Sequence, residues 1–196
     1  MIGLRRLVRD QSGATLVEFA MIAPALLMLL LGMFEMGYNY YMQSQLQGAV
    51  QKAARDSTIQ SANGNTAAVD QRVTDAVRKI VPSATMEFSR RAYSSFSDVN
   101  RPEDFTDIND NDICDDGEPF EDANGNGSWD PNRGLDGGGG ARDAVLYVVT
   151  VSYPRAFGAA QVVGLSSTFT TEASTVLRNQ PWDAQEVIAE VGNCAV

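Results

Sequence analysis

The stretch Gly13-Ala14-Thr15-Leu16-Val17-Glu18-Phe19 opens an apolar run that continues to Phe34, with Glu18 as its one charged residue. As a helix, residues 14–34 would span about 32 Å, enough to cross a hydrocarbon core of about 30 Å. A carboxylate inside a membrane helix costs about 3 kcal/mol on insertion scales, so it must find a partner. The sequence therefore predicts a transmembrane helix over residues 14–36 whose glutamate is paired.

A short basic segment precedes this helix and contains Arg5, Arg6 and Arg9. An ordinary secretory signal is cut after its apolar stretch, whereas a cut after Gly13 would keep that stretch on the mature protein. Ala14 would then be the new N-terminus, one helical turn from Glu18, and the two charges could pair within one chain or between neighbouring copies. We interpret residues 1–13 as a prepilin-type leader.

The distribution of basic residues also predicts which end of the helix faces the cytoplasm. No arginine follows the leader until Arg55. Because basic residues favour the cytoplasmic side, the N-terminus is expected in the cytoplasm and the chain beyond residue 36 outside it. Tyr38, Tyr40 and Tyr41 are expected at the outer membrane interface, which amphipathic rings prefer.

These motifs resemble a known family. The run from Gly13 to Ala20, Pro24 and the sequence Phe34-Glu35-Met36-Gly37 are similar to TadE-like proteins, the pilin-like subunits of bacterial Tad pilus systems. A weaker similarity lies at residues 178–182. The resemblance implies a minor pilin or pseudopilin that a prepilin peptidase cleaves and that works with other pilin subunits and the Tad assembly platform. It also implies a location in the bacterial inner membrane, with a periplasmic C-terminal domain, or in the extracellular pilus.

Beyond the membrane, the periodicity predicts an α+β fold, in which a long pilin-like helix packs on a small antiparallel sheet. Apolar residues recur at helical spacing within 37–82, which predicts two extracytoplasmic helices interrupted near 61–65. Alternating patterns at 86–88, 145–153 and 169–177 predict three strands of a sheet domain over 83–196.

An acidic insertion at residues 103–140 interrupts this domain. Between Glu103 and Asp136 there are twelve acidic residues and one basic residue, a local charge of −11 in a chain of net charge −10. Two segments within it carry oxygen side chains at alternate positions, which is typical of twelve-residue calcium loops, and they resemble dockerin-type calcium repeats. The expected ligands are Asp107, Asn109, Asn111, Ile113 (through its carbonyl), Asp115 and Glu118 in the first loop, and Asp122, Asn124, Asn126, Ser128 and Asp130 in the second.

Both loops depart from the ideal pattern. The first has Asp112 at the position of the sharp turn, where glycine is usual, although aspartate tolerates positive φ better than most residues. The second has Arg133 at the position of the bidentate carboxylate, so Asp136 is the expected substitute. We expect one or two calcium ions; the alternative is a solvated, disordered acidic loop.

The remaining residues limit the function further. The chain has no histidine, phosphate loop, nucleophile elbow or basic patch, so we expect neither an enzyme nor a nucleic-acid-binding protein. Cys114 and Cys194 are the only cysteines, either joined in an oxidising compartment or two free thiols. The rival function is an unprocessed membrane-anchored module for calcium-dependent binding or adhesion.

Overall fold

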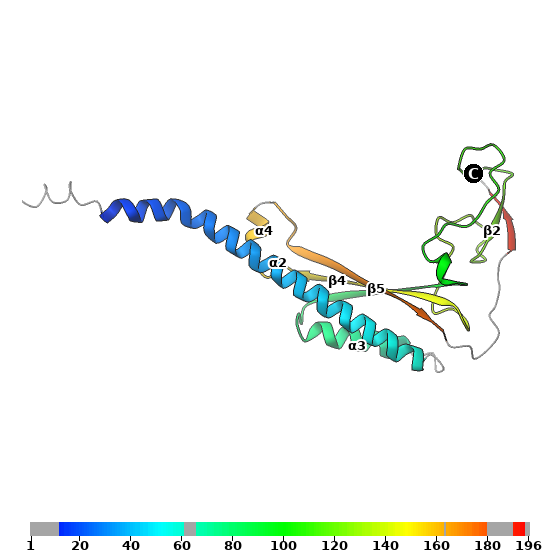
Figure 1. Ribbon diagram of the computed structural model, residues 1–196, viewed down its shortest axis with the longest axis horizontal. Helices are drawn as coiled ribbons and strands as arrows, with labels where there is room; N and C mark the ends of the chain where they lie inside the picture. The colour runs from blue at the N-terminus through cyan, green and yellow to red at the C-terminus, as the bar shows by residue number, and fades with distance from the viewer. Residues whose placement is uncertain (1–11, 61–65, 163, 180–189, 195–196) are drawn as a thin grey trace, which may run out of the picture. The chain divides into compact units, whose positions relative to one another are not determined.

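The computed structural model describes residues 12–60, 66–162, 164–179 and 190–194. They form an α+β fold with a long N-terminal helix and a small antiparallel sheet, as the sequence predicts (Figure 1). The elements are α2 (Ser12–Gln60), α3 (Thr66–Arg78), β1 (Thr85–Tyr93), the 3₁₀ turn η2 (Phe96–Asp98), β2 (Pro119–Asp122), β3 (Leu135–Asp136), β4 (Ala144–Pro154), α4 (Ala159–Val162), β5 (Thr168–Arg178) and β6 (Glu190–Asn193).

The chain forms two compact units. One contains Met1–Met42 and Pro154–Phe169, and the other contains Gln43–Tyr153 and Thr170–Val196. The first unit holds the apolar part of α2 together with the segment that carries α4. The second holds both sheets, α3 and the acidic insertion, and each unit is described by itself below.

The main sheet has four strands in the order β3-β1-β4-β5. β1 and β4 are antiparallel along their length, from Thr85 opposite Ser152 to Tyr93 opposite Ala144. Burial alternates along β4, with residues 145, 147, 149, 151 and 153 buried. The three strands that the alternation predicts are all present as β1, β4 and β5.

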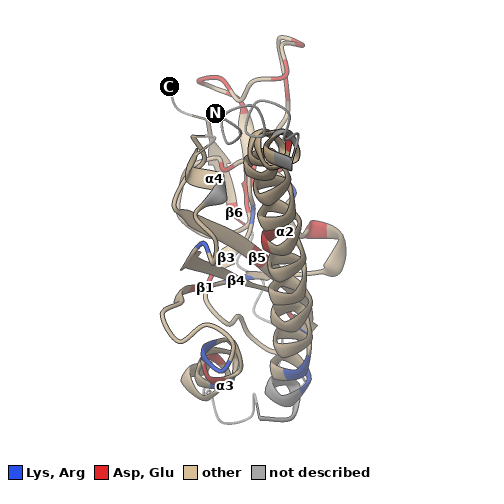
Figure 2. Ribbon diagram, turned by 90° about the vertical axis from the view of Figure 1, so that its left-hand side faces the viewer, with Lys and Arg blue, Asp and Glu red and all other residues tan. Residues whose placement is uncertain are grey.

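The helices of the second unit bury small and β-branched side chains. On α2 the buried positions are Leu46, Val50, Ala53 and Ala54, which recur at helical spacing. On α3 they include Val69, Val73 and Val77. α3 begins at Thr66, while the expected break at 61–65 lies outside the described residues. Within this unit, α3 and the part of α2 after Gln43 lie beside the sheet (Figures 1 and 2), and Gln47 Nε2 of α2 donates to the carbonyl of Ser174 on β5 at 3.4 Å.

A polar cluster fixes α3 to the sheet. The buried Tyr147 hydroxyl of β4 donates to Asp70 Oδ1 of α3 at 2.7 Å. Arg90 of β1 pairs with the same carboxylate and lies 4.5 Å above the Tyr147 ring. Burial, followed by donation to Asp70, raises the pKa of Tyr147 far above its ordinary value, so the hydroxyl keeps its proton as a donor.

We expect Tyr147→Phe to lower the free energy of unfolding by about 1.5 kcal/mol, because it removes a hydrogen bond to a charged acceptor and keeps the packed ring. Thermal unfolding of the full chain in detergent measures this change. Tyr40→Phe is the control, since Tyr40 is exposed and should tolerate the substitution. Equal unfolding temperatures for the two variants would contradict a stabilising role for this contact.

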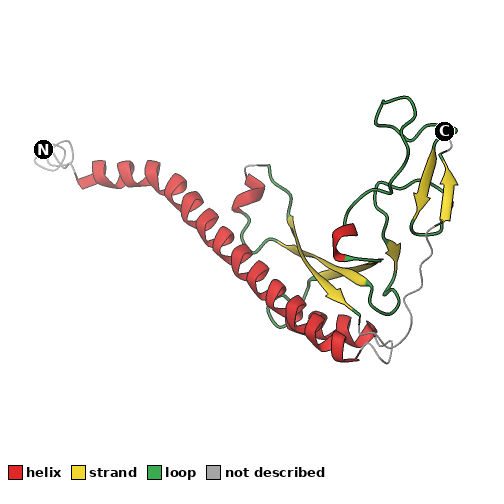
Figure 3. Ribbon diagram, turned by 45° about the vertical axis from the view of Figure 1, so that its right-hand side comes forward, coloured by secondary structure: helices red, strands yellow, loops and turns green. Residues whose placement is uncertain are grey.

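The acidic insertion adds short elements that the sequence periodicity did not predict. β2 pairs with β6 in a separate two-stranded antiparallel sheet beside the loops of the insertion (Figure 3). β3 contributes two residues to the edge of the main sheet, where Asp136 lies opposite Arg91. Segments this short carry too few residues to establish a period.

Candidate functional site

The first part of α2 presents apolar side chains on its surface. The large exposed ones between residues 15 and 34 are Leu16, Val17, Phe19, Met21, Ile22, Leu26, Leu27, Met28, Leu29, Leu30, Leu31, Met33 and Phe34. Such a patch is much larger than soluble monomers normally expose. Among the described residues, α2 is the one helix whose length and composition allow it to cross a membrane. This part of the chain fits a single-pass membrane protein.

The residues expected to serve processing lie at the start of this helix. Gly13 and Ala14 belong to the first turn of α2, and Glu18 is exposed one turn later. A Cβ atom at Gly13 would meet nothing within 4 Å, so packing inside the chain does not explain the glycine. The leader arginines fall within residues 1–11, outside the described residues.

A buried ion pair lies at the end of the apolar stretch, and sequence reasoning missed it. Glu35 is 5% exposed, and its Oε1 accepts a hydrogen bond from Arg155 Nη1 at 2.5 Å. Arg155 follows β4 directly, and its guanidinium also lies over the Phe169 ring at 5.3 Å. The two charges are 120 residues apart in sequence, so local spacing gave no signal for this pair.

The first acidic loop, residues 107–118, is organised around its first carboxylate. Asp107 accepts the backbone N–H groups of Asn111 at 3.1 Å and Asp112 at 2.8 Å. Asp112 has φ +61°, so the aspartate does adopt the conformation for which glycine is usual. The N–H of Ile113 donates to the Asn111 side-chain oxygen at 2.8 Å.

Two further carboxylates close the same loop. Asp115 Oδ2 accepts the side-chain amides of Asn109 at 2.9 Å and Asn111 at 2.6 Å. Glu118 is buried, and its two oxygens accept the backbone N–H groups of Ile108 at 2.7 Å and Asp115 at 3.0 Å. The twelfth residue therefore reaches the second and ninth positions of its own loop.

The second loop, which begins at Asp122, repeats this arrangement contact for contact. Asp122 accepts hydrogen bonds from the backbone N–H groups of Asn126 at 3.1 Å and Gly127 at 2.7 Å. Asp130 Oδ2 accepts the side-chain amides of Asn124 at 2.8 Å and Asn126 at 2.6 Å. The N–H of Ser128 donates to Asn126 Oδ1 at 2.8 Å. Gly127 has φ +79° at the position that corresponds to Asp112. The two segments are thus structural repeats, although only the second has the usual glycine.

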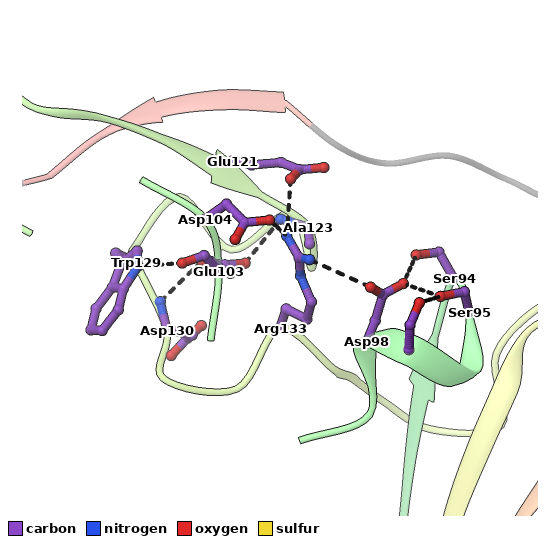
Figure 4. A network of polar contacts seen from close by, with 11 residues as sticks. Ser94, Ser95, Asp98, Glu103, Asp104, Glu121, Ala123, Trp129, Asp130 and Arg133 are labelled. Carbon is purple, nitrogen blue, oxygen red and sulfur yellow. Dashed lines mark hydrogen bonds and ion pairs between the residues drawn. The ribbon is translucent and has the colours of Figure 1, made fainter. Parts of the chain in front are cut away.

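Glu103 supplies the carboxylate that the second loop lacks in sequence. Its two oxygens accept the backbone N–H groups of Ala123 at 2.9 Å and Asp130 at 3.0 Å, the second and ninth positions of that loop (Figure 4). These are the same contacts that Glu118 makes in the first loop. Glu103 is 1% exposed, and the indole of Trp129 donates to its carbonyl at 2.9 Å.

Asp136, the substitute expected from the sequence, lines one cavity with Asn124, Asn126 and Asp130 of the second loop. It lies on β3, and its exposed carboxylate pairs with Arg91 Nε at 3.2 Å. Strand pairing with β1 holds it there. Glu103, rather than Asp136, makes the contacts that are equivalent to those of Glu118. Glu103 lies before the first loop, and the fixed spacing of a twelve-residue calcium loop does not extend to that position.

The pKa shifts in the insertion have local causes. The backbone N–H of Asp112 is the main cause that lowers the pKa of Asp107, and the amides of Asn109 and Asn111 lower that of Asp115. Burial raises the pKa of Glu103, partly offset by its backbone donors. These shifts favour the carboxylate form of the two exposed aspartates, whereas burial disfavours the charged form of Glu103.

As they stand, the described side chains include no group of three or more His, Cys, Asp and Glu residues arranged to hold a metal ion. In each loop two asparagine amides turn their nitrogens towards the shared aspartate oxygen. A cation would need the amide oxygens instead, and rotation about the last side-chain torsion exchanges the two atoms.

Arg133, at the twelfth position of the second loop, links the segments around it. Its guanidinium lies 3.5 Å from Asp98, 3.2 Å from Asp104 and 2.9 Å from Glu121 (Figure 4). The side chain is 9% exposed, and its Nε is buried without a partner among the described residues. Asp98 belongs to η2, which precedes the insertion, and Glu121 belongs to β2 within it, so one arginine links the insertion to the turn before it. The sequence departure at this position therefore has a structural role.

A disulfide joins Cys114 of the first loop to Cys194, which follows β6, with Cα atoms 5.5 Å apart. The N–H of Cys194 also donates to the carbonyl of Glu118 at 2.8 Å. The bond closes a loop between residues 80 apart in sequence, which in the chain-entropy model restrains the unfolded chain by about 4.5 kcal/mol. It ties the C-terminal strand to the insertion.

Comparison with known proteins relates the first part of the chain to one family. Residues 13–55 match the family model of the TadE-like protein, and this match covers most of α2. No curated protein and no solved structure matches the chain. The match supports the TadE-like family, which is structural and non-enzymatic, and so relates this chain to Tad pilus proteins.

Proposed function

We propose that the protein is a minor pilin or pseudopilin of a Tad-type pilus, with a structural role in pilus assembly and surface attachment. The observation that carries this proposal is the TadE-like match over residues 13–55, the segment in which the structure has an exposed apolar helix. Its partners would be a prepilin peptidase, other pilin subunits, the Tad assembly platform and the membrane.

The start of α2 supplies the chemistry of assembly in this proposal. Cleavage after Gly13 creates an amine on Ala14, and Glu18 is exposed one helical turn away. In lipid neither charge is stable alone, so the amine of one copy and the carboxylate of the next attract each other. Docking of subunits along their apolar helices would then follow the formation of this pair.

The compartment proposed for the C-terminal domain is the periplasm, with the N-terminus in the cytoplasm. Two observations support it. The arginines of the leader favour the cytoplasmic side. The Cys114–Cys194 disulfide is of the kind that persists in an oxidising compartment.

We further propose that the two loops of the insertion bind calcium. The support is the repeated arrangement of the two loops, in which Glu118 and Glu103 make equivalent contacts. Hard oxygen donors of this kind suit calcium, and extracellular modules bind it with dissociation constants of about 0.1–1 mM. Bound calcium would neutralise the acidic side chains of the insertion and hold the two loops in one conformation.

Gly13→Leu tests the proposed processing. A large side chain at the residue before the cut should block the peptidase, so the variant should keep its 13-residue leader while the wild type begins at Ala14. Intact mass of the membrane-extracted protein, produced in a host with the peptidase, measures this. Glu18→Ala is the matched variant: it should still be cleaved and inserted but should fail to assemble. A wild-type chain that begins at Met1 would contradict the pilin proposal and favour the unprocessed anchor.

A further inference from the structure

A second apolar surface lies beside the proposed membrane helix. The segment from Pro154 to Phe169 connects β4 to β5 and contains the short helix α4. Between Arg155 and Glu172 it carries no charged residue. Val162 is 67% exposed and Leu165 55% exposed, although apolar side chains in a connecting segment gain nothing from contact with water.

Two contacts fix this segment at one level of α2. Phe157 packs against Phe34 with ring centroids 6.5 Å apart. Arg155 pairs with Glu35 at 2.5 Å. Phe34 is the last residue of the apolar run, so the segment lies at the point where α2 leaves the hydrocarbon core in the proposed orientation.

The chemistry of this level is that of a membrane interface. Tyr40 and Tyr41 are exposed about two turns further along α2, in the range where aromatic rings prefer the headgroup region. Arg155 neutralises Glu35, which removes the one acidic charge that would oppose contact with lipid headgroups at this level. Phe34 is itself exposed and packs against Phe157, so an apolar contact joins the helix to the segment that carries Val162 and Leu165.

From these contacts we infer that the 154–169 segment is a membrane-seating element that inserts Val162 and Leu165 into the outer interface of the same bilayer that α2 crosses. The inference rests on the proposed membrane insertion of α2. The lipid surface is the partner of these exposed side chains, because the segment that carries them is held by Phe34 and Glu35, where the apolar run of α2 ends. The segment would give the anchor a second point of contact and so restrict rotation of the helix about its axis.

Lipid-quenching of site-specific fluorescence tests the inference. A single cysteine is introduced at Val162 in the full chain, labelled with an environment-sensitive dye without reduction of the native disulfide, and placed in nanodiscs of phosphatidylcholine brominated near the headgroup end of its acyl chains. Leu31→Cys, inside the apolar run, reports insertion of α2, and Gln51→Cys, about 24 Å beyond Glu35 along the helix, reports a site above the bilayer.

We expect the Val162 label to lose most of its fluorescence, as the Leu31 label does, while the Gln51 label keeps most of its own. Leu165→Cys should behave like Val162→Cys. Quenching at Leu31 without quenching at Val162 and Leu165 would overturn the membrane seat but leave the anchor intact, and cross-linked Val162→Cys dimers would then identify a second copy as the occupant. Absence of quenching at Leu31 would overturn the insertion of α2 itself.

Discussion

Glu103→Gln is expected to remove one of two calcium ions from the protein. The substitution keeps the size of the side chain but replaces one acceptor oxygen by an amide nitrogen. That nitrogen is a donor and would face the backbone N–H of Ala123 or Asp130. Both of these groups donate hydrogen bonds to the Glu103 oxygens in the wild type. Loss of an outer-shell partner already lowers metal affinity about 10–100-fold, so loss of a charged bidentate ligand should cost at least as much. Calorimetric titration of the full chain with calcium measures the stoichiometry.

Matched variants make this experiment specific. Asp136→Asn changes the carboxylate that the sequence pattern favoured, and it should leave both ions in place because Asp136 pairs with Arg91 on β3. Asp107→Ala combined with Glu118→Ala should remove the other ion. Loss of an ion in Asp136→Asn but not in Glu103→Gln would contradict the assignment. If the wild type gives no binding heat at about 1 mM calcium, the insertion is a solvated acidic loop after all.

Removal of calcium should make the insertion more sensitive to proteases and leave α3 and β4 folded. Twelve acidic residues between Glu103 and Asp136 repel one another unless cations neutralise them. Limited proteolysis with a chelator should cut within the insertion, while α3 and β4 stay intact because their valine and tyrosine side chains are buried. Unchanged proteolysis with and without calcium would show that the Cys114–Cys194 bond and Arg133 suffice to hold the insertion.

The parts of this fold that could be predicted are those that a local period determines. β4 alternates over eleven residues, and α3 repeats its valines at helical spacing, so burial on one face follows from the sequence. The side chains of the first acidic loop are contiguous, and for that reason their clustering could be anticipated as well. The same holds for the exposed apolar surface of α2.

The parts that could not be predicted depend on contacts between distant residues. Glu103 precedes the loop that it completes by 19 residues, and the fixed spacing of the calcium pattern directed attention to Asp136 on the other side. Arg133 looked like a defect in that pattern, whereas the fold uses it to join Asp98, Asp104 and Glu121. Two of these carboxylates are partly exposed, so solvent weakens their individual contributions.

Arg155→Ala is expected to release the 154–169 segment from α2. The substitution leaves Glu35 buried without its cation, and removal of one partner from a buried ion pair costs about 3–5 kcal/mol, because the remaining charge has lost its solvent as well as its partner. That cost corresponds to a factor of at least about one hundred in the equilibrium for local opening. Hydrogen exchange of the full chain in nanodiscs should therefore show faster exchange over residues 156–169, with little change in β1 and β4.

Two controls separate the buried charge from a general loss of stability. Arg91→Ala breaks the pair with Asp136, whose side chain is 86% exposed, and should change stability by no more than about 1 kcal/mol. Glu35→Gln combined with Arg155→Ala removes the uncompensated charge and should restore much of the protection, since the glutamine requires only ordinary hydrogen bonds. Equal exchange in Arg155→Ala and Arg91→Ala would show that water reaches Glu35, and that the pair with Arg155 does not hold this segment on the helix.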